Sequence, residues 1–92
     1  MRFEWDENKN RINIIKHGIS FEDAETVFDD ENALVLYDKE HSATEERFII
    51  IGIDIHYREL TVCHCDREDG NVIRIISARK ATKNEIKLYM GG

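Results

Sequence analysis

Basic side chains gather near the end of the chain, at Arg74, Arg79, Lys80, Lys83 and Lys87. An arginine guanidinium stays charged at physiological pH and can donate two parallel hydrogen bonds to a phosphate. Arg74 and Arg79 are therefore candidate anion-binding residues. The alternatives are a cross-strand ion pair for Arg74 and a solvated position at a helix start for Arg79 and Lys80.

The four histidines could supply proton transfer, because imidazole accepts and donates a proton near neutral pH. His17 lies at the end of a predicted helix, where the last carbonyls favour the charged ring and helix capping is the alternative role. His64 lies on the apolar face of a predicted strand, where a hydrogen-bonded, half-buried role stands beside a catalytic one. His41 and His56 fall in predicted loops or turns and are interpreted as ordinary surface residues.

The basic end contrasts with an acidic middle. Residues 72–92 carry five basic side chains and one acidic one, whereas residues 19–46 carry ten acidic side chains and one basic one. The net charge of -6 alone argues against a polyanionic partner. The uneven distribution instead permits one face that binds phosphate and another that binds a basic partner, with chance scatter as the alternative.

The length of 92 residues predicts one domain, residues 1–92, with a modest core and a shallow surface site. A composition of 41% apolar and 35% charged residues is typical of a soluble globular protein. No apolar run is long enough for a membrane span, and residues 1–10 lack the apolar core of a signal peptide. These features predict a cytoplasmic protein without a membrane partner.

Metal and cofactor motifs are not evident. Cys63 and Cys65 are two residues apart, a spacing that suits neither a disulfide between them nor a standard zinc pair. We interpret both as small buried side chains. No Ser-His-Asp spacing, phosphate-binding glycine loop or carboxylate metal motif is present, so we expect no cofactor and no metal.

The basic residues are held by a predicted strand, 72–78, a corner at Arg79 and Lys80, and a helix that begins at Thr82 and ends near Tyr89. Isoleucines occur on both faces of the strand, which favours a central place in a sheet. Strict alternation places Arg74 and Arg79 on opposite faces. We expect a bulge or a strand end near Ser77 to bring them together.

The earlier segments predict the elements around this unit. A short strand at residues 3–5 precedes a polar surface helix that starts at Asp6, has a thin apolar stripe at Ile12 and Ile15, and stops at Gly18. A second helix follows Ser20, and strands are predicted at 33–37, 47–53 and 61–65. The fold class is α+β: a small, mostly antiparallel sheet, two N-terminal helices and one C-terminal helix.

Three stretches are similar to one known family: FEWDENKNRINIIKHGISFEDAETVFDD, LYDKEHSATEERFIIIG and VIRIISARKATKNE. In this order they resemble the BrnT family, the toxin half of a bacterial type II toxin-antitoxin pair. The most specific pieces are Trp5-Asp6, Lys16-His17-Gly18, Glu46-Arg47-Phe48 and the run 74–81.

The resemblance implies a RelE-like fold and a ribonuclease toxin that inhibits translation and is neutralised by a BrnA-type antitoxin. It also implies operator DNA binding only through the antitoxin complex. Metal-free RNA cleavage needs a base for the 2′-hydroxyl, cations for the phosphorane-like transition state and an acid for the leaving 5′-oxygen. The candidate catalytic residues are His17, Arg47, His64, Arg74 and Arg79. The candidate RNA-binding residues are Trp5, Lys16, Lys80 and Lys83, with a core role as the alternative for Trp5.

Two other functions fit the same residues. One is a non-catalytic nucleic-acid-binding or co-repressor subunit, and the other is an interaction module whose charged faces serve only a partner. For a toxin, we expect the acidic segment 22–46 to face a basic part of the antitoxin.

Overall fold

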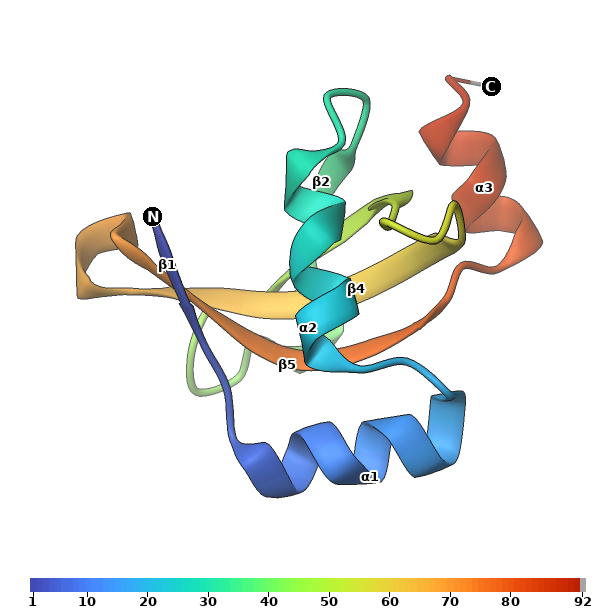
Figure 1. Ribbon diagram of the computed structural model, residues 1–92. Helices are drawn as coiled ribbons and strands as arrows, with labels where there is room; N and C mark the ends of the chain where they lie inside the picture. Colours follow the sequence, from blue (N-terminus) through green and yellow to red (C-terminus); the bar gives the residue numbers. More distant parts are fainter. Residues whose placement is uncertain (92) are drawn as a thin grey trace.

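The computed structural model describes residues 1–91 and has a five-stranded sheet at its centre (Figure 1). The strand order is β1-β5-β4-β3-β2. The strands are β1 Arg2–Glu4, β2 Leu34–Tyr37, β3 Phe48–Ile53, β4 Glu59–Arg67 and β5 Val72–Lys80. β1 runs parallel to β5 and the other pairs are antiparallel. The predicted α+β class with a mostly antiparallel sheet is confirmed.

The helices begin where the sequence places their capping residues. Asp6 accepts a hydrogen bond from the Asn8 backbone N–H at 2.8 Å and starts α1, Glu7–His17. Ser20 caps α2, Phe21–Glu25, which tightens into a 3-10 helix, η1, at Thr26–Asp29. Thr82 and the N3 glutamate form a reciprocal capping box that starts α3, Lys83–Tyr89.

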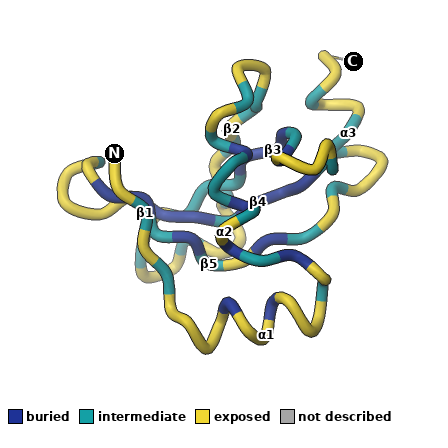
Figure 2. Tube along the Cα trace, viewed as in Figure 1, coloured by how far each residue is buried: buried dark blue, intermediate teal, exposed yellow. Residues whose placement is uncertain are grey.

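One face of the sheet is covered by α2, η1 and the segment before them, and we call it the helix-covered face. Its core is made of apolar side chains from both layers: Ile19, Phe21, Ala24, Val27, Ile50, Leu60, Val62, Ile75 and Ala78. Figure 2 shows the burial concentrated in the middle of the sheet, with α1 largely exposed. Because these elements lie on one side of the sheet, its other face is only partly covered.

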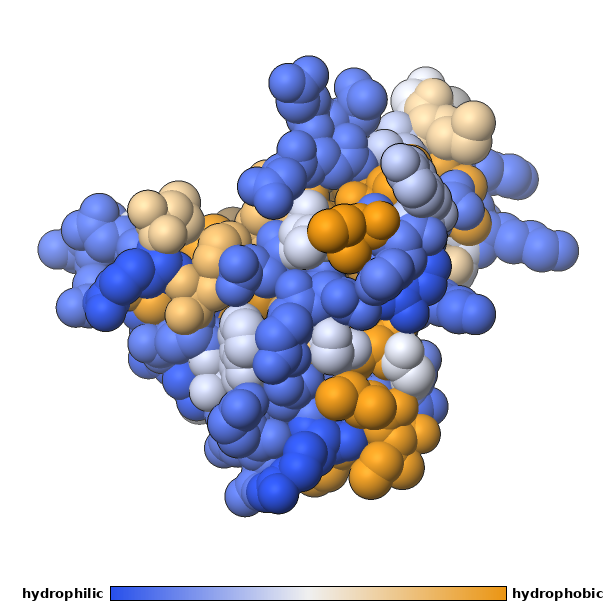
Figure 3. Space-filling view, in the orientation of Figure 1, coloured by the Kyte–Doolittle hydropathy of each residue, from blue (hydrophilic) through white to orange (hydrophobic). Residues whose placement is uncertain are grey.

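α1 packs through polar side chains instead of the Ile12 and Ile15 stripe. Asn13 donates to the Ala78 carbonyl at 2.8 Å and accepts from the Ala78 N–H at 3.1 Å, so it pairs with the free edge of β5. Asn10 accepts from the Phe21 N–H at 2.8 Å. Both asparagines are buried, whereas Ile12 and Ile15 are exposed. Figure 3 shows an apolar patch on the surface toward the C-terminal end of α1.

A bulge in β5 decides where its arginines point. Cys63 pairs with Ser77 and His64 pairs with Ile75, which leaves Ile76 without a partner on β4. The extra residue shifts the alternation, so Arg74 and Arg79 lie on the same face of the sheet, opposite the helix-covered face. The expected bulge near Ser77 is confirmed. The predicted corner at Arg79 and Lys80 is wrong, because β5 continues through both residues.

No helix within residues 1–91 is long and apolar enough to cross a membrane.

Candidate functional site

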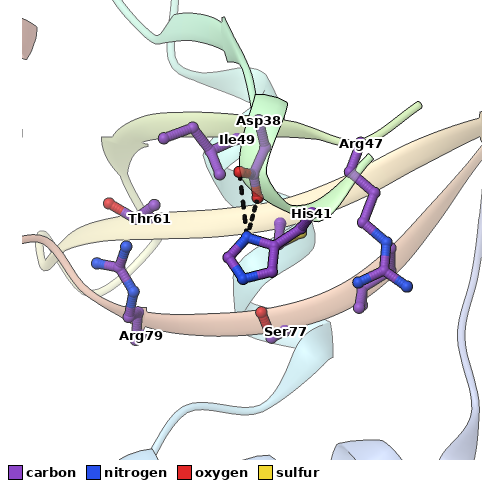
Figure 4. Close-up of a pocket in the computed structure, with 9 residues that line it drawn as sticks. Asp38, His41, Arg47, Ile49, Thr61, Ser77 and Arg79 are labelled. Atoms are coloured by element: carbon purple, nitrogen blue, oxygen red, sulfur yellow. Dashed lines mark hydrogen bonds and ion pairs between the residues drawn. The ribbon is translucent and has the colours of Figure 1, made fainter. Parts of the chain in front are cut away.

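The face of the sheet opposite the core carries a pocket, and we call this side the open face. α3 covers one end of it, because Glu85 accepts a hydrogen bond from Thr61 Oγ1 at 2.9 Å. The pocket beside this contact has a volume of about 160 Å³. Figure 4 shows the side chains that line it: Asp38, His41, Arg47, Ile49, Thr61, Cys63, Ile76, Ser77 and Arg79. We call it the open-face pocket.

The loop between β2 and β3 is held beside this pocket by a serine at its base. Ser42 Oγ donates to the Asp38 carbonyl at 2.6 Å and accepts from the Arg47 N–H at 2.9 Å. The Asp38 N–H also donates to the Arg47 carbonyl at 2.9 Å, which extends the hairpin by one pair. A short 3-10 helix, Lys39–His41, then turns the chain back over the open face. The loop thereby has a defined shape that places His41.

His41 and Asp38 form a pair inside the pocket lining. His41 Nδ1 lies 3.0 and 3.1 Å from the two carboxylate oxygens of Asp38. The ring lies between Arg79 and Arg47 in the view of Figure 4, with Ser77 below it. The interpretation of His41 as an ordinary surface residue overlooked this pocket. The one signal in the sequence was an aspartate three positions before the histidine, at the spacing that one helical turn brings together.

Arg79 forms the most extensive ion pair on the open face. Its two terminal nitrogens donate to Glu85 at 2.6 and 2.9 Å. Hydrogen bonding to Glu85 raises the pKa of Arg79. Hydrogen bonds from Arg79 lower the pKa of Glu85 to about 2, against desolvation by burial, which raises it. The Arg79 side chain is still 42% exposed, and it lines the open-face pocket.

Arg47 makes weaker ionic contacts with the rest of the protein than Arg79 does. Its nearest carboxylate, Glu45, lies 3.7 Å away. Within residues 1–91, its Nε is the buried side-chain nitrogen or oxygen that lacks a hydrogen-bond partner. A buried donor of this kind costs free energy until a ligand or water accepts from it. With a side chain 30% exposed and no carboxylate closer than 3.7 Å, Arg47 therefore keeps its terminal nitrogens available for an anion.

Arg74 lies on the open face with Arg47 and Arg79, but it does not line the pocket. It donates to Glu4 of β1 at 2.8 Å, so the cross-strand ion pair given as its alternative role is present. Arg67 pairs with Glu45 at 3.1 Å on the same face. Arg47, Arg67, Arg74 and Arg79 thus lie on the open face, and the last three each have a carboxylate oxygen within 3.1 Å.

The two histidines predicted to act in catalysis lie elsewhere. His64 faces the core side, is 4% exposed, and has ring centroid distances of 4.9 Å to Phe28 and 6.0 Å to Phe48. Burial lowers its pKa and keeps the ring neutral. His17 is half-buried at the end of α1 and does not line the open-face pocket. The structure brings neither ring to the arginines.

The four predicted RNA-binding residues are also dispersed. The Trp5 ring packs edge-on to Phe21 with centroids 6.1 Å apart and belongs to the border of the core. Lys16 is exposed on α1. Lys80 lines another pocket on the far side of the β5 end, and Lys83 begins α3.

The thiol and the carboxylates of the pocket limit the chemistry that it can perform. Burial raises the pKa of the Cys63 thiol, which keeps it a weak nucleophile. The described residues contain no group of three or more His, Cys, Asp or Glu side chains that could hold a metal ion. The pocket thus offers two arginines for an anion and an imidazole for proton transfer.

Comparison with known proteins identifies related chains. The sequence model of a family described as the ribonuclease toxin BrnT of type II toxin-antitoxin systems matches residues 5–85. The crystal structure of the Brucella abortus ribonuclease toxin BrnT is similar, with a TM-score of 0.69 and 28% sequence identity. The similarity covers 90% of this chain and 99% of that chain. No curated protein matches the sequence.

Proposed function

Because the chain belongs to the BrnT family of ribonuclease toxins of type II toxin-antitoxin systems, we propose that it is an endoribonuclease that cleaves RNA at the open-face pocket. The observation that carries this proposal is the placement of Arg47 and Arg79 around one pocket. Cleavage uses no metal ion, because guanidinium groups supply the positive charge that the transition state needs. By cutting RNA, the toxin inhibits translation in the cytoplasm.

Both arginines would bind the scissile phosphate, and they differ in how firmly the protein restrains them. Arg47 is the less restrained of the two, since its carboxylate neighbour lies 3.7 Å away and its side chain is 30% exposed, which leaves its terminal nitrogens free to donate to phosphate oxygens. Arg79 is already fixed in direction by Glu85 and offers its exposed edge. A preorganised donor loses little free energy to reorganisation when charge develops in the transition state.

Arg74 extends the same surface toward β1 and would contact a neighbouring phosphate of the RNA strand. Its ion pair with Glu4 is partly exposed, and such pairs are weak enough for a phosphate to compete with them. The positions of His17, His64, Trp5, Lys16 and Lys80 give no support for an RNA contact at this pocket. Lys83 stands at the start of α3, one residue after Thr82.

An antitoxin of the BrnA type is the partner that would neutralise the chain, and operator DNA would be bound only through that complex. The acidic surface around η1 supports a basic contact segment. Asp29 and Glu31 are exposed there, beside a pocket of about 410 Å³ that includes Ile53, Ile55 and Tyr89. Opposite charges on two partners raise the rate of association more than the final affinity.

The antitoxin proposal is tested by stopped-flow association of the toxin with its antitoxin. Charge reversal at Asp29 and Glu31 should lower the association rate about tenfold at low salt and remove most of its salt dependence. Reversal of Glu68 and Asp69, two exposed acids at the distant β4–β5 turn, is the matched control. Equal rates for both charge-reversed proteins would contradict the assignment.

The ribonuclease proposal is tested with the purified chain, a labelled single-stranded RNA and EDTA. We expect products that end in a 2′,3′-cyclic phosphate and begin with a 5′-hydroxyl, and no cleavage where the attacking nucleotide lacks its 2′-hydroxyl. Strict dependence on a divalent ion would refute metal-free cleavage. Tight RNA binding without any cleavage would favour the non-catalytic nucleic-acid-binding alternative.

A further inference from the structure

His41 is a second feature of the open-face pocket, and its role builds on the proposed ribonuclease activity. We propose that His41 is the general base that takes the proton from the attacking 2′-hydroxyl, and that Asp38 is its positioning residue. The observation is the pair of contacts, 3.0 and 3.1 Å, between His41 Nδ1 and the Asp38 carboxylate, on the rim of a pocket that Arg47 and Arg79 also line.

The hydrogen bond to Asp38 selects the form of the imidazole ring. A carboxylate only accepts hydrogen bonds, so His41 Nδ1 must carry the proton. In the neutral ring, Nε2 then keeps its lone pair, and this is the atom that can accept a proton. Asp38 itself is fixed by its N–H bond to the Arg47 carbonyl at 2.9 Å and by the Ser42 bond to its own carbonyl. The loop therefore presents His41 in one tautomer, with Nε2 as the proton-accepting atom.

The reaction balances with these groups alone. Nε2 of His41 takes the 2′-hydroxyl proton while the 2′-oxygen forms a bond to phosphorus. The bond from phosphorus to the 5′-oxygen breaks, and the leaving oxygen takes a proton from water. The imidazolium then releases its proton to solvent. Arg47 and Arg79 compensate the charge on the phosphate oxygens during the exchange.

His41 is better placed for this role than the other histidines. Its side chain is 63% exposed, so a ribose can approach the ring, whereas His64 is buried on the opposite face of the sheet. His56 gives a matched comparison, because its Nε2 lies 3.3 Å from Asp23 in a similar exposed pair. The His56 pair lies away from the open-face pocket and lacks the two arginines.

The test is single-turnover cleavage of RNA by His41→Ala, with His56→Ala as control. We expect His41→Ala to lower the cleavage rate by about 10²–10⁴-fold and added imidazole to restore part of it, since a small base can enter the emptied space. Affinity for an RNA with a 2′-deoxy nucleotide at the cleavage site should remain unchanged. His56→Ala should cleave at the wild-type rate.

The outcomes separate this inference from the proposed function. If the wild type cleaves RNA and His41→Ala cleaves equally fast, the role of His41 is refuted while the ribonuclease proposal stands. If the wild type does not cleave RNA, both are refuted. A slow His41→Ala variant that imidazole does not accelerate, or that binds RNA weakly, would mean that the ring only shapes the loop and would overturn the proposal.

The role of Asp38 is tested by a double-mutant cycle. The amide introduced by Asp38→Asn can donate to Nδ1, which would move the ring proton to Nε2 and block the base. We expect a large fall in kcat with little change in KM when His41 is present, and no further fall in the His41→Ala background. An equal loss in both backgrounds would show a merely structural contact.

Discussion

Replacement of Glu85 by glutamine tests how the structure restrains Arg79. The carboxylate accepts from Arg79, from Thr61 and from the Thr82 N–H, and its pKa is about 2 instead of the ordinary 4.5. The interval between these values corresponds to roughly 3 kcal/mol of stability before solvent screening is considered. Since the Arg79 side chain is 42% exposed, solvent screening reduces the expected loss in Glu85→Gln to about 1–2 kcal/mol at pH 7.

The same pKa fixes the pH range of the effect. A folded-state pKa below the unfolded value means that the stabilisation is present above pH 4.5 and is lost as the pH falls toward 2. At pH 3, about 60% of the difference between wild type and Glu85→Gln should have disappeared. Urea denaturation of both proteins at pH 7 and pH 3 measures this difference in unfolding free energy. Glu46→Gln is the control, because it removes an exposed carboxylate that takes no part in the contacts of Arg79 and Glu85.

Glu85→Gln has a second expected effect, on RNA. Removal of the carboxylate takes away the negative charge beside the guanidinium of Arg79, so a phosphate on the exposed edge of Arg79 is no longer repelled by it. Affinity for an uncleavable RNA analogue should rise about two- to fivefold although the protein is less stable. Unchanged stability at pH 7, or an equal loss at pH 7 and pH 3, would refute the reasoning about this ion pair.

Three further substitutions, with Ile15→Ala as the control for the first, test contacts inside the fold. Asn13→Ala leaves the backbone N–H and carbonyl of Ala78 without partners and should lower the unfolding free energy in urea by about 2–4 kcal/mol. Ile15 is 86% exposed, so Ile15→Ala should leave the unfolding free energy unchanged. Similar losses of stability in both variants would argue that α1 does not dock through Asn13. Tyr89→Phe removes the 2.7 Å bond to Asp30 and should lower the unfolding free energy by about 1 kcal/mol, an estimate that an unchanged urea midpoint would disprove. His64 has a lowered pKa in the fold, so its contribution to stability is present above pH 6.5 and falls at lower pH. His64→Gln should flatten this dependence, and a persistent slope would assign it to other groups.

The sequence predicted the order of elements and most of their limits because their signals are local. Asp6, Ser20 and Thr82 cap helices where their side-chain oxygens can meet the free N–H groups of the first turn. Gly18 ends α1 with a positive φ of 70°, as glycine does most readily. The length of β5 was underestimated because Arg79 and Lys80 lack the apolar character that marked the rest of the strand.

The site was only partly predictable, because it depends on contacts between distant segments. Arg47 and Arg79 were identified from their charge, yet their shared pocket depends on the register of β3, β4 and β5. His41 was overlooked because its local signal, an aspartate three positions earlier, is common in polar loops and does not reveal the pocket that distant strands form beside it. α1 docks through Asn10 and Asn13, where hydrogen bonds to backbone groups outweigh the apolar stripe that periodicity favours.

The most direct test of the account is the cleavage rate of RNA by Arg47→Ala and Arg79→Lys in EDTA, with Arg11→Ala on α1 as the control for loss of an exposed arginine. Folding of each variant is checked by its urea midpoint. If the open-face pocket is the active site, Arg47→Ala should be slower by about 10²–10³-fold and Arg79→Lys should lose at least part of its activity, because lysine cannot donate two parallel bonds. Arg11→Ala should cleave like the wild type. Wild-type rates for both pocket variants would contradict the placement of the active site at the open-face pocket.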